Sequence, residues 1–438
     1  MRKIPRRDFL KAAAAAAAPL ILPATAWGRA GRPSPSERIT LGCIGMGNQG
    51  QWDMQAFLAM PEVQVVAVCD VDAGKLAAGK RRVESHYAAR QASGPYSGCA
   101  AYGDYRALLA REDIDAVLIA TPDHWHALMT VEAARSGKDI YCEKPLSYSF
   151  AEGRAMVDAV RRYKRVLQTG TQRRSSAVCR QACELVRNGR IGRLHTIRVG
   201  LPKGFAIRGG YSGHEPPMPV PQGFNYDLWL GPAPWVPYTE GRCHFNFRWI
   251  VDYGEGYISD WGAHYLDVGQ MGHGTDRSGP VKISAQAVKF LPSGFYDAPV
   301  GFHIDYFYAD GVRMIGSTEE VLGMRFEGDA GWIHVERPGA SGLEAEPASV
   351  LDSVIRPDEI HLPRSRGHHQ NFIDCVRSRA ETVAPAEVGH RSATICHLGM
   401  IAALLGHDLH WDPDRECLVG DSQAARMLSR PMREPWQL

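Results

Sequence analysis

The feature that most constrains the fold is a glycine-rich turn between an apolar strand and a helix. Residues 38–44 form the expected strand, and the sequence GMGNQG follows directly at positions 45–50. An expected helix over 51–59 leads to a second strand over 62–69, which ends at Asp70. Such a turn needs its first glycine for a tight bend, its second for the approach of a pyrophosphate and its third for helix–strand packing. The pattern predicts a dinucleotide-binding βαβ unit.

Asp70 follows the third glycine at the distance at which such units carry an acidic residue. Its carboxylate would accept hydrogen bonds from the ribose hydroxyls of the adenosine, and its charge would repel a 2′-phosphate. We therefore expect NAD rather than NADP as the cofactor. A glycine motif alone is often only a turn, so the inference depends on the flanking strand, helix and acid.

Strands and helices continue to alternate as far as residue 170. The expected helices cover 75–90, 102–110, 127–136 and 150–163, and the expected strands cover 115–120, 138–142 and 165–169. Alternation at this spacing predicts a parallel, doubly wound sheet. Residues 38–170 are thus expected to form an α/β Rossmann domain.

The pattern changes after residue 170. A helix over 178–188 and a strand over 194–201 precede a long irregular segment, 202–237, which is rich in proline, glycine and aromatic residues. Loops of this length are usually functional or disordered, and the aromatic residues argue against disorder.

Residues 171–410 are expected to form an α+β domain built on a mostly antiparallel open sheet. A helix over 259–271 precedes the strands, helices over 367–377 and 387–405 close the domain and can pack back on the first one, and 411–438 would be a C-terminal tail. The strands, interpreted as an antiparallel meander, cover 281–290, 302–308, 311–317, 322–327 and 330–336.

Residues 1–30 have the order and spacing of a twin-arginine secretory signal. An arginine pair at 6–7 precedes an alanine run at 12–18, and an Ala-Thr-Ala triplet at 24–26 supplies small residues for cleavage. The alternative is a basic, alanine-rich tail. We expect export to the periplasm, with 31–37 as a linker, because the apolar run is too short for a membrane span.

The composition is that of an ordinary globular protein, with a net charge of +2 and 22% charged residues. This balance gives no electrostatic reason to expect nucleic acid or a membrane surface as a partner. Ten cysteines are scattered along the chain. Cys179 and Cys183 are close in sequence, but no second pair stands at metal-site spacing, so no metal site is expected.

Lys144 stands at the end of a predicted strand. The strand over 138–142 stops at Glu143-Lys144-Pro145, since proline cannot continue it. In an open parallel sheet, ligands bind at the carboxyl ends of the strands, so a lysine there is placed for chemistry. The alternative is a surface lysine at the start of a loop.

Asp260 and His264 form a second candidate pair. They are one helical turn apart in the predicted helix and would share a face. A carboxylate beside an imidazole can orient the ring and stabilise its protonated form, as a general base requires. The alternative is that Asp260 only interacts with the helix dipole and His264 points to solvent.

Together, these motifs resemble the Gfo/Idh/MocA oxidoreductase family. The resemblance rests on the glycine turn, Thr121-Pro122-Asp123 with His126, Glu143-Lys144-Pro145, and Asp260 with His264, in this order and at suitable separations. It covers residues 38–411. It implies hydride transfer between a carbinol carbon and nicotinamide, a dimer or tetramer built on the second sheet, and a cis peptide before Pro145.

The resemblance also implies roles for individual residues. Lys144 would hydrogen-bond the reacting hydroxyl, His264 would take its proton, and Asp260 would position substrate and base. The residues expected to bind the cofactor are Gly45, Met46, Gly47, Asn48, Gln49, Asp70, Thr121, Pro122, Asp123, His126, Glu143 and Lys144. The family often has Asn at the position of Asp123, which leaves the effect of the carboxylate on cofactor binding open.

Five further residues are candidates for substrate binding. Trp125 could stack on a sugar face or simply pack in the protein. Gln172 and Arg173 follow a predicted strand, and Arg248 and Trp249 come shortly before Asp260. Each could bind hydroxyls or an acidic sugar group, or serve only the structure.

Three hypotheses for the function follow. The first is an exported NAD-dependent dehydrogenase acting on a hydroxyl of a sugar, polyol or glycoside. The second is a glycoside hydrolase or lyase with tightly bound, recycled NAD, which suits a compartment where free NAD is scarce. The third is a sensor without catalysis, against which the presence of Lys144, Asp260 and His264 argues.

Overall fold

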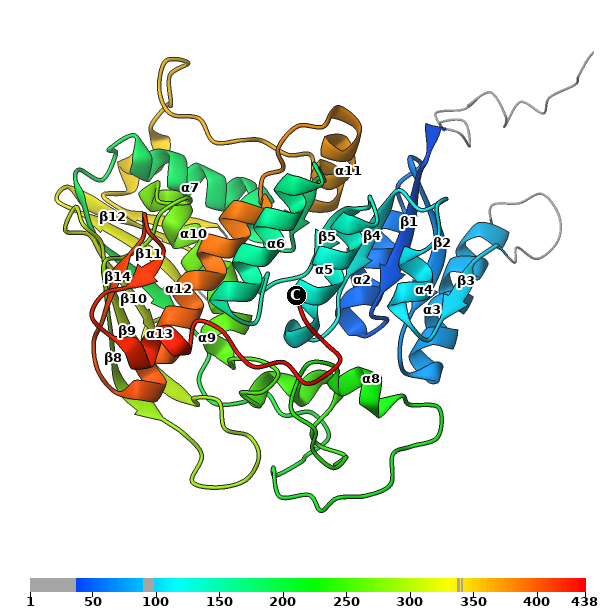
Figure 1. Ribbon diagram of the computed structural model, residues 1–438. Coiled ribbons are helices and arrows are strands. Elements are labelled where there is room, and N and C mark those ends of the chain that lie inside the picture. The colour runs from blue at the N-terminus through cyan, green and yellow to red at the C-terminus, as the bar shows by residue number, and fades with distance from the viewer. Residues whose placement is uncertain (1–36, 90–97, 337–338, 340–341) are drawn as a thin grey trace, which may run out of the picture.

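The computed structural model describes residues 37–89, 98–336, 339 and 342–438. The predicted signal peptide and nearly all of the predicted linker lie outside the described residues. The two expected domains are present, with the first at the right and the second at the left of Figure 1. Among the described residues, no helix is both long enough and apolar enough to cross a membrane.

The first domain is a parallel sheet covered by helices, as the alternating pattern predicts. Its strands, in the spatial order β3-β2-β1-β4-β5-β6, pair in parallel throughout the described residues. The strands are β1 (Ile39–Ile44), β2 (Val63–Cys69), β3 (Ala100–Tyr102), β4 (Ala116–Ile119), β5 (Asp139–Cys142) and β6 (Leu167–Thr169). The helices are α2 (Asn48–Leu58), α3 (Ala73–Ala88), α4 (Tyr105–Leu109), α5 (His126–Arg135) and α6 (Phe150–Arg162).

The predicted helix over 102–110 starts too early. Tyr102 belongs to β3 and pairs with Cys69 of β2. The helix begins only after Asp104, whose carboxylate caps it by accepting a hydrogen bond from the backbone N–H of Arg106.

The second domain contains a sheet with the strand order β13-β12-β11-β7-β10-β9-β8-β14-β15 among the described residues. Its strands are β7 (Leu194–Gly200), β8 (Lys282–Lys289), β9 (Gly301–Phe307), β10 (Arg313–Ser317), β11 (Gly323–Gly328), β12 (Gly331–Val335), β13 (Leu343–Glu346), β14 (Leu409–Asp412) and β15 (Cys417–Leu418). Its helices are α7 (Ala177–Arg187), α8 (Tyr226–Leu230), α9 (Tyr257–Asp260), α10 (Gly262–His273), α11 (His368–Ser378), α12 (Ala386–Leu405) and α13 (Ser422–Arg426).

The predicted meander is wrong at one point. Strands β10 and β11 are not neighbours, because β7 lies between them, parallel to β10 and antiparallel to β11. The chain crosses close to the end of β7, where a Cβ on Gly200 would lie 1.9 Å from the carbonyl oxygen of Val321. Local sequence patterns identify strands but not their partners, so β7, which is distant in sequence, was not expected inside the sheet.

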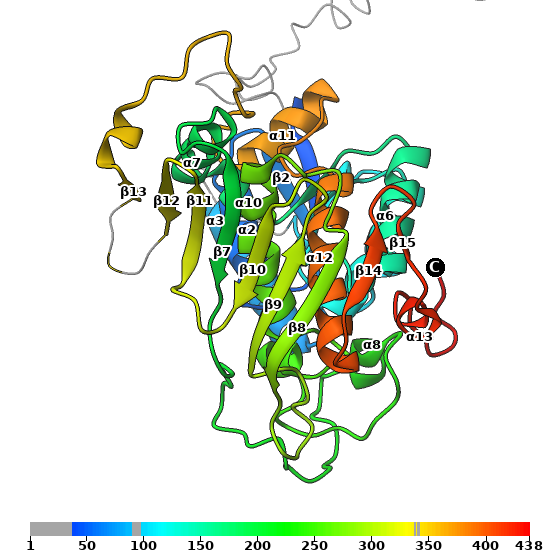
Figure 2. The ribbon, with the colours of Figure 1, turned by 90° about the vertical axis from the view of Figure 1, so that its left-hand side faces the viewer.

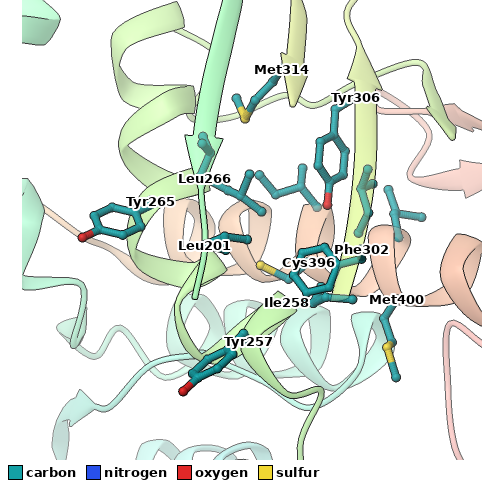
Figure 3. Packing of buried hydrophobic residues seen from close by; sticks show 14 of the residues in the cluster. Leu201, Tyr257, Ile258, Tyr265, Leu266, Phe302, Tyr306, Met314, Cys396 and Met400 are labelled. Carbon is teal, nitrogen blue, oxygen red and sulfur yellow. The ribbon is translucent and has the colours of Figure 1, made fainter. Parts of the chain in front are cut away.

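Helices cover one face of the second sheet. In Figure 2 the sheet faces the viewer, and α10 and α12 lie behind it. Figure 3 shows the packed layer, in which Met314 and Tyr306 from the strands meet Leu266 of α10 and Cys396 of α12. A Cβ on Gly269 of α10 would lie 2.9 Å from the Met314 side chain, so the glycine allows the helix to approach the sheet.

The closing helices and the C-terminal segment tie the two domains together. Helix α12 packs against α6 and β6 of the first domain, and α11 packs against α2. Residues 411–438 were expected as a tail, but they form β15 and α13 and then return to the first domain. There the Trp436 ring packs edge-on against Trp125 at 4.8 Å. The cleft between the domains is therefore fixed from several sides.

Candidate active site

The glycine turn has the geometry of a cofactor cradle. Gly45 has φ +89°, and a Cβ there would lie 2.5 Å from the carbonyl oxygen of Ala120. A Cβ on Gly50 would lie 1.8 Å from the Gly45 oxygen, whereas a Cβ on Gly47 would meet nothing within 4 Å. The first and third glycines thus allow close packing, and the second leaves the backbone open to a ligand. This arrangement fits a dinucleotide at the start of α2.

Asp70 is held beside this turn. One carboxylate oxygen accepts the Met46 N–H at 2.7 Å, and the other accepts the Asp72 N–H at 2.8 Å. Burial raises the pKa of Asp70, although the two backbone hydrogen bonds act in the opposite direction. The side chain is therefore oriented at the end of β2, where a ribose would bind.

A cavity of about 550 Å³ extends from this turn to Lys144. Most of the residues predicted to bind the cofactor lie on its wall, namely Gly45, Gly47, Asn48, Gln49, Asp70, Thr121, Pro122, Asp123, Glu143 and Lys144. Met46 and His126 are not among the described wall residues. The Met46 side chain is buried against α3, so only its backbone reaches Asp70.

His126 is a buried structural link rather than part of the wall. Its ring nitrogens lie 2.8 Å from the carbonyl oxygen of Pro145 and 3.0 Å from that of Thr121. Burial lowers the pKa of His126 to about 4, so the ring is neutral at pH 7. It connects the loop after β4 to the loop that carries Lys144, whose peptide bond to Pro145 is cis.

The opposite wall comes from the segment between β7 and α9. Arg208, Tyr211, Phe224, Glu240 and Phe245 line the cavity there, and none of them was predicted individually. For Tyr211 and Phe224 the signal was the aromatic composition of the irregular segment 202–237.

Lys144 meets Asp260 across the domain boundary. The Lys144 Nζ donates to Asp260 Oδ1 at 2.7 Å and to the Asp260 carbonyl oxygen at 2.8 Å. The Arg248 Nε donates to the same Oδ1 at 3.1 Å. Burial would raise the pKa of Asp260, but the charges of Lys144 and Arg248 and their hydrogen bonds hold it below its usual range. Asp260 is therefore an ionised anchor for two cations.

His264 lies near this cluster but does not pair with Asp260. The predicted helix is interrupted at Trp261, so Asp260 ends α9 and His264 belongs to α10. The Nδ1 atom of His264 is buried without a hydrogen-bonding partner among the described residues. Burial, followed by the charge of Lys144, lowers the pKa of His264 well below its usual value. The ring is neutral, and its role as base stays a prediction.

Asp123 and Glu143 are two buried carboxyl groups in the cavity wall. Burial raises the pKa of Asp123 to about 8, against the opposing charges of Arg248 and Lys144. Burial and the charge of Asp53 raise the pKa of Glu143 to about 8 as well. The Gln172 side chain donates to Glu143 at 3.0 Å. Gln172, a substrate-binding candidate, therefore contacts a wall residue of the cavity but is not among the described wall residues itself.

The remaining substrate candidates differ in position. Trp125 and Arg248 line the cavity, although Trp125 is almost fully buried and donates its Nε1–H to the carbonyl oxygen of Trp229. Arg173 pairs with Glu336 at 2.9 Å and stacks on Tyr265. Trp249 is fully buried and stacks on Phe205. Packing thus accounts for the contacts of Arg173 and Trp249.

Comparison with known families identifies the class of protein. Residues 39–171 match "Oxidoreductase family, NAD-binding Rossmann fold", and residues 176–438 match "Oxidoreductase family, C-terminal alpha/beta domain". The chain therefore belongs to the Gfo/Idh/MocA oxidoreductase family. Residues 3–23 match the twin-arginine translocation signal, which indicates export by that route.

Individual relatives match a smaller part of the chain than the two family models do. The chain is 34% identical over 164 residues to "Uncharacterized oxidoreductase YrbE" of Bacillus subtilis, covering 37% of this chain and 44% of that protein. It is 32% identical over 178 residues to a "Glycosyl hydrolase family 109 protein" of Shewanella baltica, covering 37% and 38%. These matches span less than half of either relative.

Among solved structures, the fold is similar to an aldose-aldose oxidoreductase from Caulobacter crescentus. The TM-score is 0.60 at 19% identity, with 85% of this chain and 99% of the other covered. This likeness extends over both domains and confirms the predicted fold class.

Proposed function

We propose that this protein is an NAD-dependent oxidoreductase that acts on a CH–OH group of a sugar, polyol or glycoside. The observation that carries the proposal is the Lys144–Asp260 pair, 2.7 Å apart, with Lys144 on the wall of the cavity that begins at the glycine turn. A cation anchored by a carboxylate at the far end of a dinucleotide cleft is placed to bind a hydroxyl oxygen.

Each residue of the pair has a distinct task in this proposal. Bound nicotinamide would accept or return the hydride. Lys144 donates to the substrate hydroxyl and lowers its pKa, and Asp260 holds Lys144 and the substrate in register. His264, which is neutral at pH 7, takes the hydroxyl proton. Asp70 selects NAD, because a 2′-phosphate would meet its charge.

The direct test measures NADH formation by the mature protein with NAD and a panel of sugars and polyols. Stoichiometric NADH from one of these substrates is the expected outcome. Absence of both NADH formation and NAD binding would refute the proposal.

A second candidate is a glycoside-cleaving enzyme with recycled NAD. The segment between β7 and α9, green in Figure 1, crosses from the second domain to the β2–α3 loop of the first. There the Asn225 N–H donates to the Val71 carbonyl at 2.9 Å, and the Ala73 N–H donates to the Gly223 carbonyl at 2.8 Å. Release of a cofactor from the Asp70 side would require these bonds to open, which favours retention over exchange.

The two candidates are separable by nucleotide release and by products. Denaturation of the purified protein should release stoichiometric NAD if the cofactor is retained. The cycling enzyme should then liberate sugar from an aryl glycoside without net NADH. A protein purified without nucleotide that reduces added NAD would be the dissociable dehydrogenase.

A periplasmic location and a homo-oligomer complete the proposal. Among the described residues, no helix layer covers the sheet face turned toward the viewer in Figure 2, and such a face is suited to pairing with a second copy. Recovery of the mature protein in the periplasmic fraction tests the location. Light scattering of the protein purified from that fraction tests the oligomeric state.

A further inference from the structure

A buried Ser–His–Glu chain lies behind the Lys144–Asp260 pair. The His397 Nδ1 is 3.0 Å from each carboxylate oxygen of Glu255, and its Nε2 is 3.3 Å from the Ser147 Oγ. A carboxylate only accepts, so Nδ1–H donates to Glu255, and the Ser147 hydroxyl lies within hydrogen-bonding distance of Nε2.

The order of these atoms is that of a hydrolase triad, but their location excludes that role. Ser147 is 0% exposed and His397 is 2% exposed, and neither lies on the wall of the cofactor cavity. No substrate carbonyl can reach the Ser147 oxygen, so the chain does not supply a nucleophile.

The three residues come from the segments that carry the proposed site. Ser147 follows Lys144 in the same loop, separated only by Pro145 and the buried Leu146. Glu255 stands at the start of the turn into α9, and Asp260 is the last residue of that helix. His397 belongs to α12, which packs against both domains. The His397 ring therefore connects the loop that carries Lys144 to the loop that contains Glu255 and leads into α9 and Asp260.

A second contact fixes the same two loops independently. The Tyr148 hydroxyl donates to the carbonyl oxygen of Val251, and the Arg430 guanidinium lies 4.2 Å from the centre of the Tyr148 ring. Because these contacts remain when His397 is changed, loss of its ring should loosen the two loops without unfolding the domain boundary.

We propose that His397 is a positioning residue that sets the separation of Lys144 and Asp260 through Ser147 and Glu255. The inference rests on the proposed function of that pair. A displacement of about 1 Å at a reacting group costs on the order of 100-fold in rate. A side chain that holds both loops from behind can therefore control turnover without touching substrate or cofactor.

The chain offers a matched control on the same helix. His390 of α12 is also fully buried and pairs with a glutamate, its Nε2 lying 3.0 Å from Glu416 Oε1. Its partner belongs to neither of the two loops. His397→Gln and His390→Gln each remove a buried histidine–glutamate pair, but only His397 contacts the segments that carry Lys144 and Asp260.

We expect His397→Gln to lower kcat by at least about tenfold, with KM for the sugar and the Kd for NAD changed less than kcat. His390→Gln should lower Tm by a similar amount and leave kcat at the wild-type level. Glu255→Gln keeps a hydrogen-bond acceptor for Nδ1–H and should retain more activity than Glu255→Ala. Equal kcat in the two histidine variants would overturn the proposal.

A readout independent of turnover separates this inference from the proposed function. The rate at which an amine-selective reagent modifies Lys144, read by mass spectrometry, should rise several-fold in His397→Gln and stay unchanged in His390→Gln. If the wild-type protein oxidises no CH–OH substrate but this difference appears, the proposed function fails and the positioning role stands. An unchanged rate in His397→Gln refutes the positioning role.

Discussion

The Lys144 ammonium and the Asp260 carboxylate lie 2.7 Å apart across the boundary between the two domains. Lys144 comes from the loop after β5, and Asp260 ends α9 in the second domain. Neither side chain is more than 16% exposed, so the pair is shielded from most of the solvent. The position of one domain relative to the other therefore determines whether the proposed hydroxyl-binding cation is in place.

Lys144→Met should abolish most of the turnover while the fold survives. Asp260 keeps a counter-charge in this variant, because Arg248 still donates to it at 3.1 Å. We expect kcat to fall by about 10²–10⁴-fold, the usual contribution of a positioned proton donor, with the Kd for NAD within a few-fold of wild type. Steady-state kinetics and NAD titration measure the two quantities.

The control for this variant is the Lys203–Glu319 pair, which has a similar distance of 2.8 Å but lies on the surface. Lys203→Met should leave kcat unchanged and shift Tm little, because an exposed ion pair contributes little to stability. Substantial activity in Lys144→Met would remove Lys144 from the proposed mechanism.

Asp260→Asn should be the more destabilising of the two changes. It leaves the cations of Lys144 and Arg248 facing each other without a shared carboxylate. Removing one partner from a buried ion pair costs about 3–5 kcal/mol, and here two cations lose theirs. Thermal unfolding at neutral pH should therefore rank wild type above Lys144→Met and Lys144→Met above Asp260→Asn. The reverse order would show that Arg248 alone does not satisfy Asp260.

Much of the first domain was predictable because its signals are local. The glycine turn, Asp70 and the alternating strands lie within short stretches of sequence, and their combination predicts a dinucleotide-binding domain although the glycine motif alone does not. The second domain was less predictable: β7 enters the sheet between β10 and β11 through a long-range pairing. The cavity residues Arg208 and Phe245 were missed, since only tertiary structure brings that segment over the first domain.

Asp70→Asn should reduce discrimination between the two nicotinamide cofactors. The amide keeps one oxygen to accept a backbone N–H, but only one of the two hydrogen bonds from Met46 and Asp72 is fully replaced. Loss of the negative charge removes the repulsion of a 2′-phosphate. We expect the Kd for NAD to rise, the Kd for NADP to fall, and the ratio to shift by at least about tenfold, or 1.4 kcal/mol. Fluorescence titration with NADH and NADPH gives both constants; an unchanged ratio would assign selection to another residue.

His264→Gln tests the proposed base. The pKa of His264 lies well below its usual value because of burial and the charge of Lys144. The wild-type profile of kcat/KM against pH should therefore lack an inflection at the ordinary histidine pKa of about 6.5. The variant should lose about 10²–10⁴-fold in kcat and keep NAD binding. An inflection near pH 6.5 that disappears in His264→Gln would show that His264 keeps the ordinary pKa in the enzyme before substrate binds, because kcat/KM reports the ionisations of that form.

Asp123→Asn should stabilise the cofactor-free protein in a way that depends on pH. The pKa of Asp123 is raised by burial from 3.8 to about 8. Between these values the folded protein keeps a proton that the unfolded chain has released, so the folded state binds more protons. Stability then falls as pH rises, by about 1.4 kcal/mol per pH unit for this group. Asparagine does not titrate, so the free energy of unfolding of the variant does not include this fall with pH.

The difference in free energy of unfolding between Asp123→Asn and wild type should grow from pH 5 to pH 8 and then level off. Denaturant titrations across pH 5–9 measure it, and Glu143, whose pKa is also raised to about 8, contributes equally to both proteins. The contribution of Asp260 to stability depends on pH in the opposite sense. Because its pKa is lowered, that contribution is lost only as pH falls below the usual pKa range of a carboxyl group. A difference that does not change with pH would mean that Asp123 stays ionised beside Lys144 and Arg248.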